Sequence, residues 1–151
     1  PLRTRRDVEA VVQGLVDGSI EVIASDHSPC AAELKLRELD AAPFGVIGME
    51  TLLAVSIHAL VEPGHLTWLQ LIEKLSTNPA RILGIDRGTL APGRPADVVL
   101  IDPNEPWTID SSQFRSLARN CPFDGWQVRG RVRSVLVGGE LRFTRTAARS
   151  S

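Results

Sequence analysis

The residue of this chain best placed to do chemistry is Asp26, which directly follows a short apolar run over residues 20–25 (IEVIAS). Such a run is typical of a strand buried on both faces of a parallel sheet, and these sheets bind ligands beyond the carboxyl ends of their strands. A carboxylate there can accept a proton and later return it. Asp26 therefore lies where a catalytic group is expected, and an N-cap or turn aspartate is an equal interpretation of the residues alone.

The three histidines do not have the spacing of a metal site. His27 follows Asp26 immediately, and neighbours in a strand point in opposite directions, so a catalytic Asp26 favours a structural role for His27. His58 lies in an apolar helical stretch and His65 in a loop, which favours packing or surface roles for both.

The two cysteines, Cys30 and Cys121, form no CxxC motif and are too few for a disulfide framework. A reducing cytoplasm is therefore the expected location. A thiol can be a nucleophile, but no histidine and asparagine pattern supports that role for Cys30. An inert loop cysteine is the favoured interpretation.

Composition indicates a soluble globular chain that is one domain or part of a larger one. The 151 residues are 43% hydrophobic and 23% charged, with a net charge of −1, which favours neither a nucleic-acid nor a membrane partner. We expect no signal peptide and no membrane-spanning segment. A complete eight-stranded α/β barrel needs on the order of 250 residues, more than this chain has.

Helices are predicted on both sides of the apolar run. Thr4 and Asp7 predict an N-cap, and apolar residues at helical spacing predict a helix over 5–17 that ends at Gly18. The strand over 20–25 follows directly, giving the helix-then-strand half-unit of a parallel α/β fold. After a structured loop over 31–48, the predicted helices cover 50–61, 67–76 with a capping box at Thr67 and Gln70, and 78–83 with a stop at Gly84.

From Gly88 onward helical periodicity gives way to turns and short β-rich runs. The runs cover 97–101, 107–109, 127–133, 134–137 and 140–144, and Gly138-Gly139 predicts a tight hairpin between the last two. We therefore predict two units. Residues 1–87 form the α/β part, and residues 88–151 form a small β module with a frayed tail over 147–151.

Six segments match one known family in the same order and with near-gapless spacing. They are 25–29 (SDHSP), 42–51 (APFGVIGMET), 78–84 (NPARILG), 88–93 (GTLAPG), 96–103 (ADVVLIDP) and 120–126 (NCPFDGW). Together they make nearly the whole chain resemble the C-terminal part of the dihydroorotases, which are cyclic amidohydrolases.

The resemblance implies a fold and a reaction. The fold would be α/β, a partial TIM-type (β/α) barrel comprising its last strand and closing helices, with the C-terminal part of a small β-sandwich. In this family two zinc ions hold a hydroxide that attacks the ring amide of (S)-dihydroorotate. The product is N-carbamoyl-L-aspartate, and the reaction is a reversible step of de novo pyrimidine biosynthesis. Metal-bound water loses its proton near neutral pH, so such a site can hydrolyse an unactivated amide.

The resemblance also assigns roles to single residues. Asp26 matches the aspartate that binds metal and shuttles the proton. Phe44 and Gly45 match the substrate-contacting loop, where glycine admits the main chain and phenylalanine forms an apolar wall. Cys30 stands where the family usually has a substrate-contacting histidine, and a thiol is a poorer hydrogen-bond partner. Arg3 matches a segment near the substrate, but a solvated charge is an equal interpretation and it is not a predicted site residue.

Most of the family's metal ligands are absent from this sequence. A His-x-His, two later histidines and a carboxylated lysine would lie upstream of Pro1, so we predict that the chain alone binds no binuclear zinc and is inactive. Two alternatives remain open. One is allantoinase or another cyclic amidohydrolase, because Cys30 with Glu33 and Lys35 resembles allantoinase. The other is an inactive dihydroorotase-like partner of aspartate carbamoyltransferase. A homo-oligomer is equally compatible with the resemblance.

Overall fold

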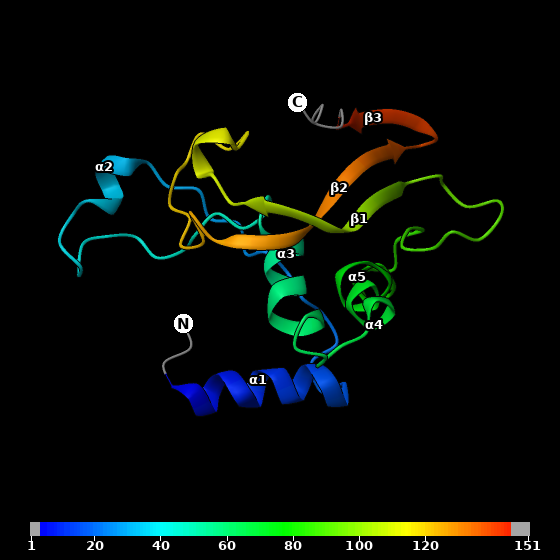
Figure 1. The fold of residues 1–151 in the computed structure, drawn as a ribbon, viewed down its shortest axis with the longest axis horizontal. Coiled ribbons are helices and arrows are strands. Elements are labelled where there is room, and N and C mark those ends of the chain that lie inside the picture. The colour runs from blue at the N-terminus through cyan, green and yellow to red at the C-terminus, as the bar shows by residue number, and fades with distance from the viewer. Residues whose placement is uncertain (1–3, 146–151) are drawn as a thin grey trace.

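The computed structural model describes residues 4–145. Arg3 and the predicted tail over 147–151 lie outside the described residues. The chain runs from a mainly helical first part into a three-stranded antiparallel sheet (Figure 1).

Helix α1 (Arg5–Asp17) has the predicted bounds. The Thr4 hydroxyl accepts a hydrogen bond from the Asp7 N–H, and the Asp7 carboxylate accepts one from the Thr4 N–H, which closes a capping box. Gly18 ends the helix in the left-handed conformation at φ 89°, which costs glycine little. The buried face is narrower than predicted, since Leu15 is buried but three of the apolar positions remain exposed. They are Val8, Val11 and Val16.

Two longer helical segments mix α- and π-helical turns. Helix α3 (Leu52–Ser56) continues into η1 (Ile57–Val61), so the helix predicted over 50–61 is confirmed except for its first two residues. Helix α4 (Trp68–Ile72) begins at the predicted Thr67 capping box and continues through η2 (Glu73–Thr77) into α5 (Asn78–Leu83).

The short helix predicted from residue 78 is therefore the end of a continuous helical segment. Pro79 lies in the first turn of α5, directly after the π turn. Gly84 ends the segment at φ 65°, as predicted.

The strand predicted over 20–25 is not formed, and this prediction was wrong. The run is held instead by the last helical segment: the Ile23 N–H donates to the Lys74 carbonyl at 3.1 Å, and Lys74 Nζ donates to the Ile20 carbonyl at 2.8 Å. A strand needs a neighbour for its ladder, and the part of the chain that the structure describes provides a single parallel bridge, His27 to Val46, just beyond the run.

The segment predicted as a loop over 31–48 contains one helical turn, α2 (Ala32–Lys35). It projects away from the helices and the sheet in Figure 1.

The sheet is an antiparallel meander of β1 (Val98–Thr108), β2 (Gln127–Val137) and β3 (Glu140–Thr144), in that order. The five predicted runs merge into these three strands. Irregularities in the β1–β2 ladder after Leu100 and after Asp102 break the alternation of side chains, which is why the sequence pattern divides each long strand. The Gly138-Gly139 hairpin is confirmed, with both residues at positive φ.

Helices α1, α3, α4 and α5 lie on one side of the sheet, and α3 stands between α1 and the strands (Figure 1). One buried cluster joins α1, η1 and α4 through Leu15, Ile57, Leu60, Leu66 and Leu71. A second cluster joins α3 to the β-rich part through Ala54, Ile109 and Val128. The second cluster crosses the predicted division between 1–87 and 88–151, and that division stays a prediction. None of the described helices has the length and apolar character needed to cross a membrane.

Candidate active site

The candidate site lies where the end of the 20–25 run meets the loop that precedes α3. His27 and Val46 form a parallel bridge, in which the Ser28 N–H donates to the Val46 carbonyl at 2.9 Å. Because the two segments run in the same direction, the residues just before the bridge, Asp26 and Gly45, are neighbours across it. The structure thus brings together Asp26 and the predicted substrate loop from positions almost 20 apart in the sequence.

Asp26 has an unusual backbone and an uncommitted side chain. Its φ is +42°, which makes it the non-glycine residue with positive φ among the described residues. Aspartate adopts this left-handed conformation more readily than most residues, but the conformation is still uncommon and often occurs at functional sites. Its carboxylate is exposed and makes no hydrogen bond or ion pair with residues 4–145, so it caps no helix and remains available to a ligand.

His27 is turned toward the loop and holds it. Its Nδ1 accepts hydrogen bonds from the main-chain N–H groups of Gly48 at 3.1 Å and Met49 at 3.4 Å. An accepting Nδ1 requires the tautomer with its proton on Nε2. This arrangement supports the structural role predicted for His27.

Two glycines allow the loop to approach the run closely. A Cβ on Gly45 would lie 2.5 Å from the Ser28 Cβ, and Gly45 has φ +96°. A Cβ on Gly48 would lie 2.7 Å from the Ser25 carbonyl oxygen. Both distances are shorter than real contacts, so other residues would push the loop away from Asp26. Just before Gly45, Phe44 is 94% exposed, and its ring is free to face a ligand.

Two side chains that were not predicted as site residues hold the same loop. Lys35 Nζ donates to the carbonyls of Pro43 and Gly45, each at 2.7 Å. Asn120 Nδ2 donates to the carbonyls of Ser28 at 2.9 Å and Gly45 at 3.2 Å. Asn120 belongs to one of the segments that match the family, but nothing in the sequence indicates which residues it contacts.

The remaining candidates are placed as follows. Cys30 is half-buried, and its Sγ makes one weak contact with the Ala31 carbonyl at 3.5 Å. His58 Nδ1 is 2.8 Å from a carboxylate oxygen of Glu62, and its ring packs edge-on against Trp126. His58 and His65 are not part of the candidate site.

The described residues do not form a metal site by themselves. No group of three histidine, cysteine, aspartate or glutamate side chains in residues 4–145 is arranged to hold a metal ion. Zinc sites in proteins use at least three protein ligands. Asp26 offers one free carboxylate and thus fits as a single member of a larger ligand set.

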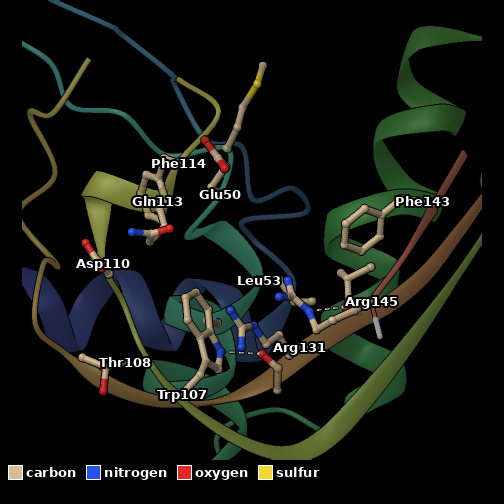
Figure 2. A pocket seen from close by; sticks show the side chains of 14 residues that line it. Glu50, Leu53, Trp107, Thr108, Asp110, Gln113, Phe114, Arg131, Phe143 and Arg145 are labelled. Atoms are coloured by element: carbon tan, nitrogen blue, oxygen red, sulfur yellow. Dashed lines mark hydrogen bonds between the residues drawn. The ribbon is translucent and has the colours of Figure 1, made fainter. Parts of the chain in front are cut away.

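A separate cavity of about 650 Å³ lies between α3 and the sheet, and Met49 and Glu50 are among the residues that line it. Figure 2 shows two arginines along its floor: Arg131 lies 4.7 Å over the Trp107 ring, and Arg145 lies 5.6 Å over the Phe143 ring. Burial, followed by the nearby Arg131 charge, lowers the pKa of Arg145. None of the predicted site residues lines this cavity. We therefore place the candidate site at Asp26, where a free carboxylate lies next to the Phe44–Gly45 loop.

Comparisons with known proteins identify the family. A model described as the amidohydrolase family matches residues 2–142. The chain belongs to the amidohydrolase family. Members of this family are generally metal-dependent, although the described residues of this amidohydrolase chain supply no complete ligand set.

Curated relatives confirm the resemblance predicted from the sequence. The chain is 49% identical over 141 residues to a dihydroorotase of Acetivibrio thermocellus, covering 93% of the chain and 33% of the relative. It is 47% identical over 145 residues to a dihydroorotase of Geobacter metallireducens, covering 96% of the chain and 34% of the relative. This amidohydrolase chain therefore spans about a third of the length of the curated relatives it matches.

Solved structures give a consistent fold. An L-hydantoinase (dihydropyrimidinase) of Arthrobacter aurescens matches with a TM-score of 0.87 at 32% identity, over 93% of this chain and 32% of that one. A D-hydantoinase (dihydropyrimidinase) of Thermus sp. matches with a TM-score of 0.85 at 29% identity, over the same shares. The amidohydrolase chain thus has the same arrangement of helices and strands as part of these enzymes.

Proposed function

We propose that the protein is a dihydroorotase that reversibly hydrolyses (S)-dihydroorotate to N-carbamoyl-L-aspartate in de novo pyrimidine biosynthesis. The observation that carries this proposal is the free, exposed carboxylate of Asp26 beside the Gly45 loop, in a chain up to 49% identical to dihydroorotases. A carboxylate without hydrogen-bond partners in the described part of the chain can take up a proton and release it again.

Each residue of the candidate site has a proposed role. Asp26 contributes a metal ligand and moves the proton between the attacking water and the leaving ring nitrogen. Gly45 brings the loop's main chain to the substrate, and the exposed Phe44 ring covers one side of it. Cys30 stands at the position of a substrate-contacting histidine and offers only a weak hydrogen-bond partner.

The proposed cofactor is a pair of zinc ions. When bound, the zinc pair would supply a Lewis acid for the amide carbonyl and would lower the pKa of a bound water. Because the described residues include one suitable carboxylate, Asp26, the remaining ligands would come from parts of the protein that this chain does not contain. On this proposal the chain alone holds no tight zinc pair and is inactive.

The proposal includes the architecture of the whole protein. Residues 1–87 would belong to a metal-dependent TIM-type barrel and residues 88–151 to a small β-sandwich, in line with the hydantoinase structures that the chain resembles. Residues 20–25 would then become a strand once barrel neighbours supply a ladder. We also propose a cytoplasmic protein whose partner is the small ring substrate, with no nucleic-acid or membrane partner. Self-association and association with aspartate carbamoyltransferase are both compatible with this architecture.

The test is a substrate comparison on the intact protein. We expect zinc-dependent turnover of dihydroorotate, with little activity on allantoin or hydantoin. Asp26→Asn should lower kcat by about 10²-fold or more, since it removes the proton-transferring group. Asp40→Asn, at an exposed aspartate outside the site, is the matched control and should retain full activity.

A specific observation favours a second candidate, another cyclic amidohydrolase. The solved structures that resemble the chain include hydantoinases, and Cys30 departs from the dihydroorotase pattern. Turnover of allantoin or hydantoin in preference to dihydroorotate would establish this candidate instead. Absence of turnover with all three rings in the zinc-loaded intact protein would favour the inactive structural partner.

A further inference from the structure

A single side chain from the β-rich part of the molecule holds both segments of the candidate site. Asn120 Nδ2 donates to the carbonyls of Ser28 and Gly45, which lie 92 and 75 positions away in the sequence. The main-chain carbonyl of Asn120 also accepts a hydrogen bond from the Ile47 N–H at 3.2 Å. Asn120 therefore fixes the loop relative to the segment that carries Asp26.

The amide oxygen of Asn120, Oδ1, indicates that the side chain does more than fill space in the core. Its Oδ1 is buried and accepts no hydrogen bond from any described residue. A buried acceptor without a donor is destabilising, so an apolar residue of similar size would be the better choice if packing alone mattered. The two hydrogen bonds donated by Nδ2 are the feature of this side chain that an apolar residue cannot replace.

The Gly45 carbonyl accepts from Lys35 as well as Asn120, and the Pro43 carbonyl accepts from Lys35. In a trans peptide the N–H points opposite to the carbonyl, so holding the Pro43 carbonyl directs the Phe44 N–H away from Lys35. The N–H groups of Phe44 and Gly45 donate to no atom of residues 4–145. The two side chains thus fix the outer loop by its carbonyls and leave its N–H groups unused.

We infer that Asn120 is a positioning residue for substrate binding, which sets the place of the Phe44–Gly45 loop beside Asp26 from the β-rich part of the chain. This inference rests on the proposed function, because it takes this loop to contact the ring substrate. Asn120 itself need not touch substrate. Its effect passes through the main chain of Ser28 and Gly45.

The decisive variants are Asn120→Asp and Asn120→Ala in the intact protein. Asn120→Asp keeps the shape of the side chain but replaces the donor with an oxygen that faces two carbonyls. We expect it to raise KM for dihydroorotate by about tenfold or more, because small displacements of a binding loop have large effects. Asn120→Ala, which removes the donor without adding repulsion, should raise KM less. A packing role predicts the reverse order.

Asn78 offers a matched control. Its Nδ2 donates to the Glu21 carbonyl at 3.0 Å, so it ties a helix to the same run but at the end away from Asp26. Asn78→Ala should leave KM within about twofold of the unchanged protein, since the loop keeps all its contacts. If Asn120→Asp does not fold, Asn120→Gln replaces it in the test. Because Asn120→Gln retains the amide donor, its KM should be lower than that of Asn120→Ala.

A second readout separates this inference from the proposed function. Hydrogen exchange of a peptide covering residues 43–48 should be faster in Asn120→Asp than in Asn78→Ala or the unchanged protein. If the unchanged protein does not turn over dihydroorotate, the proposed function fails, and the exchange result still decides whether Asn120 holds the loop. The inference is overturned if exchange in this peptide is unchanged, or if active Asn120→Asp protein keeps its original KM.

Discussion

At the scale of the residue, the candidate site depends on a few backbone conformations that bring Asp26 and the loop together. Asp26 sits at φ +42° with a free carboxylate, while Gly45 sits at φ +96° against Ser28. These conformations place a free carboxylate on the segment that the loop approaches, and the Phe44 and Gly45 N–H groups of that loop donate to no described residue. His27, the neighbour of Asp26, is occupied with the Gly48 and Met49 N–H groups and supports this geometry.

Cys30 gives a prediction at this scale. Cys30→His should lower KM for dihydroorotate by about threefold to tenfold in the intact protein, because an imidazole donates a stronger hydrogen bond than a thiol. Steady-state kinetics measures the change. Cys30→Ser, which alters the group without extending its reach, is the control and should leave KM close to its original value. An unchanged KM in Cys30→His would mean that residue 30 does not contact substrate.

At the scale of the element, local hydrogen bonds define where segments start and how the loops of the β-rich part are held. The helices α1 and α4 begin at capping boxes centred on Thr4 and Thr67. In the β-rich part, the Asp124 carboxylate accepts a hydrogen bond from the Ser111 N–H at 2.6 Å, at the start of the short helix η3 (Ser111–Gln113). Both kinds of contact satisfy N–H groups that would otherwise lack a partner.

The Asp124 contact predicts a pH dependence. The hydrogen bond from the Ser111 backbone lowers the pKa of Asp124, so the ionised carboxylate favours the folded state. This stabilisation is complete above the unfolded pKa of about 3.9 and is lost as the pH falls through the lower folded pKa. Asp124→Asn should therefore lower Tm by a few degrees at pH 7, and the difference should shrink below about pH 3.9.

Thermal unfolding at pH 7 and at pH 3 measures the Tm difference. Asp40→Asn is the control, because Asp40 is exposed and makes no side-chain hydrogen bond with the described residues. A Tm difference for Asp124→Asn that stays constant between pH 7 and pH 3 would contradict the assignment.

At the scale of the whole molecule, packing joins helix α3 to the β-rich part of the chain, which also carries Asn120. The cluster of Ala54, Ile109 and Val128 joins α3 to the β-rich part, and Ile109 is only 1% exposed. Its main chain also pairs with Trp126 and Gly125. This cluster therefore connects the two parts of the chain that supply Asn120 and the loop's following helix.

Removing this packing should destabilise the protein as a unit. Ile109→Ala should lower the free energy of unfolding by about 2–5 kcal/mol, because it leaves a cavity in a fully buried cluster. Leu117→Ala is the control, since Leu117 is 94% exposed, and it should change stability by less than about 0.5 kcal/mol. Denaturant unfolding followed by two probes measures both variants. Similar stability for the two would mean that the cluster does not couple the helices to the sheet.

The sequence by itself determined the features that depend on near neighbours. The bounds of α1, the capping boxes, the stops at Gly18 and Gly84 and the Gly138-Gly139 hairpin follow from hydrogen bonds and backbone preferences within a few residues. The order of its segments also indicated the family, which the curated relatives confirm.

Only the tertiary structure decided which distant groups meet. It paired the segment that carries Asp26 with the Gly45 loop, and it brought Asn120 to the Ser28 and Gly45 carbonyls. It also showed that residues 20–25 form no strand. These outcomes depend on partners that lie far away in the sequence or on a neighbouring strand. A residue's own type and its local pattern carry no information about such partners, because packing of the whole molecule selects them.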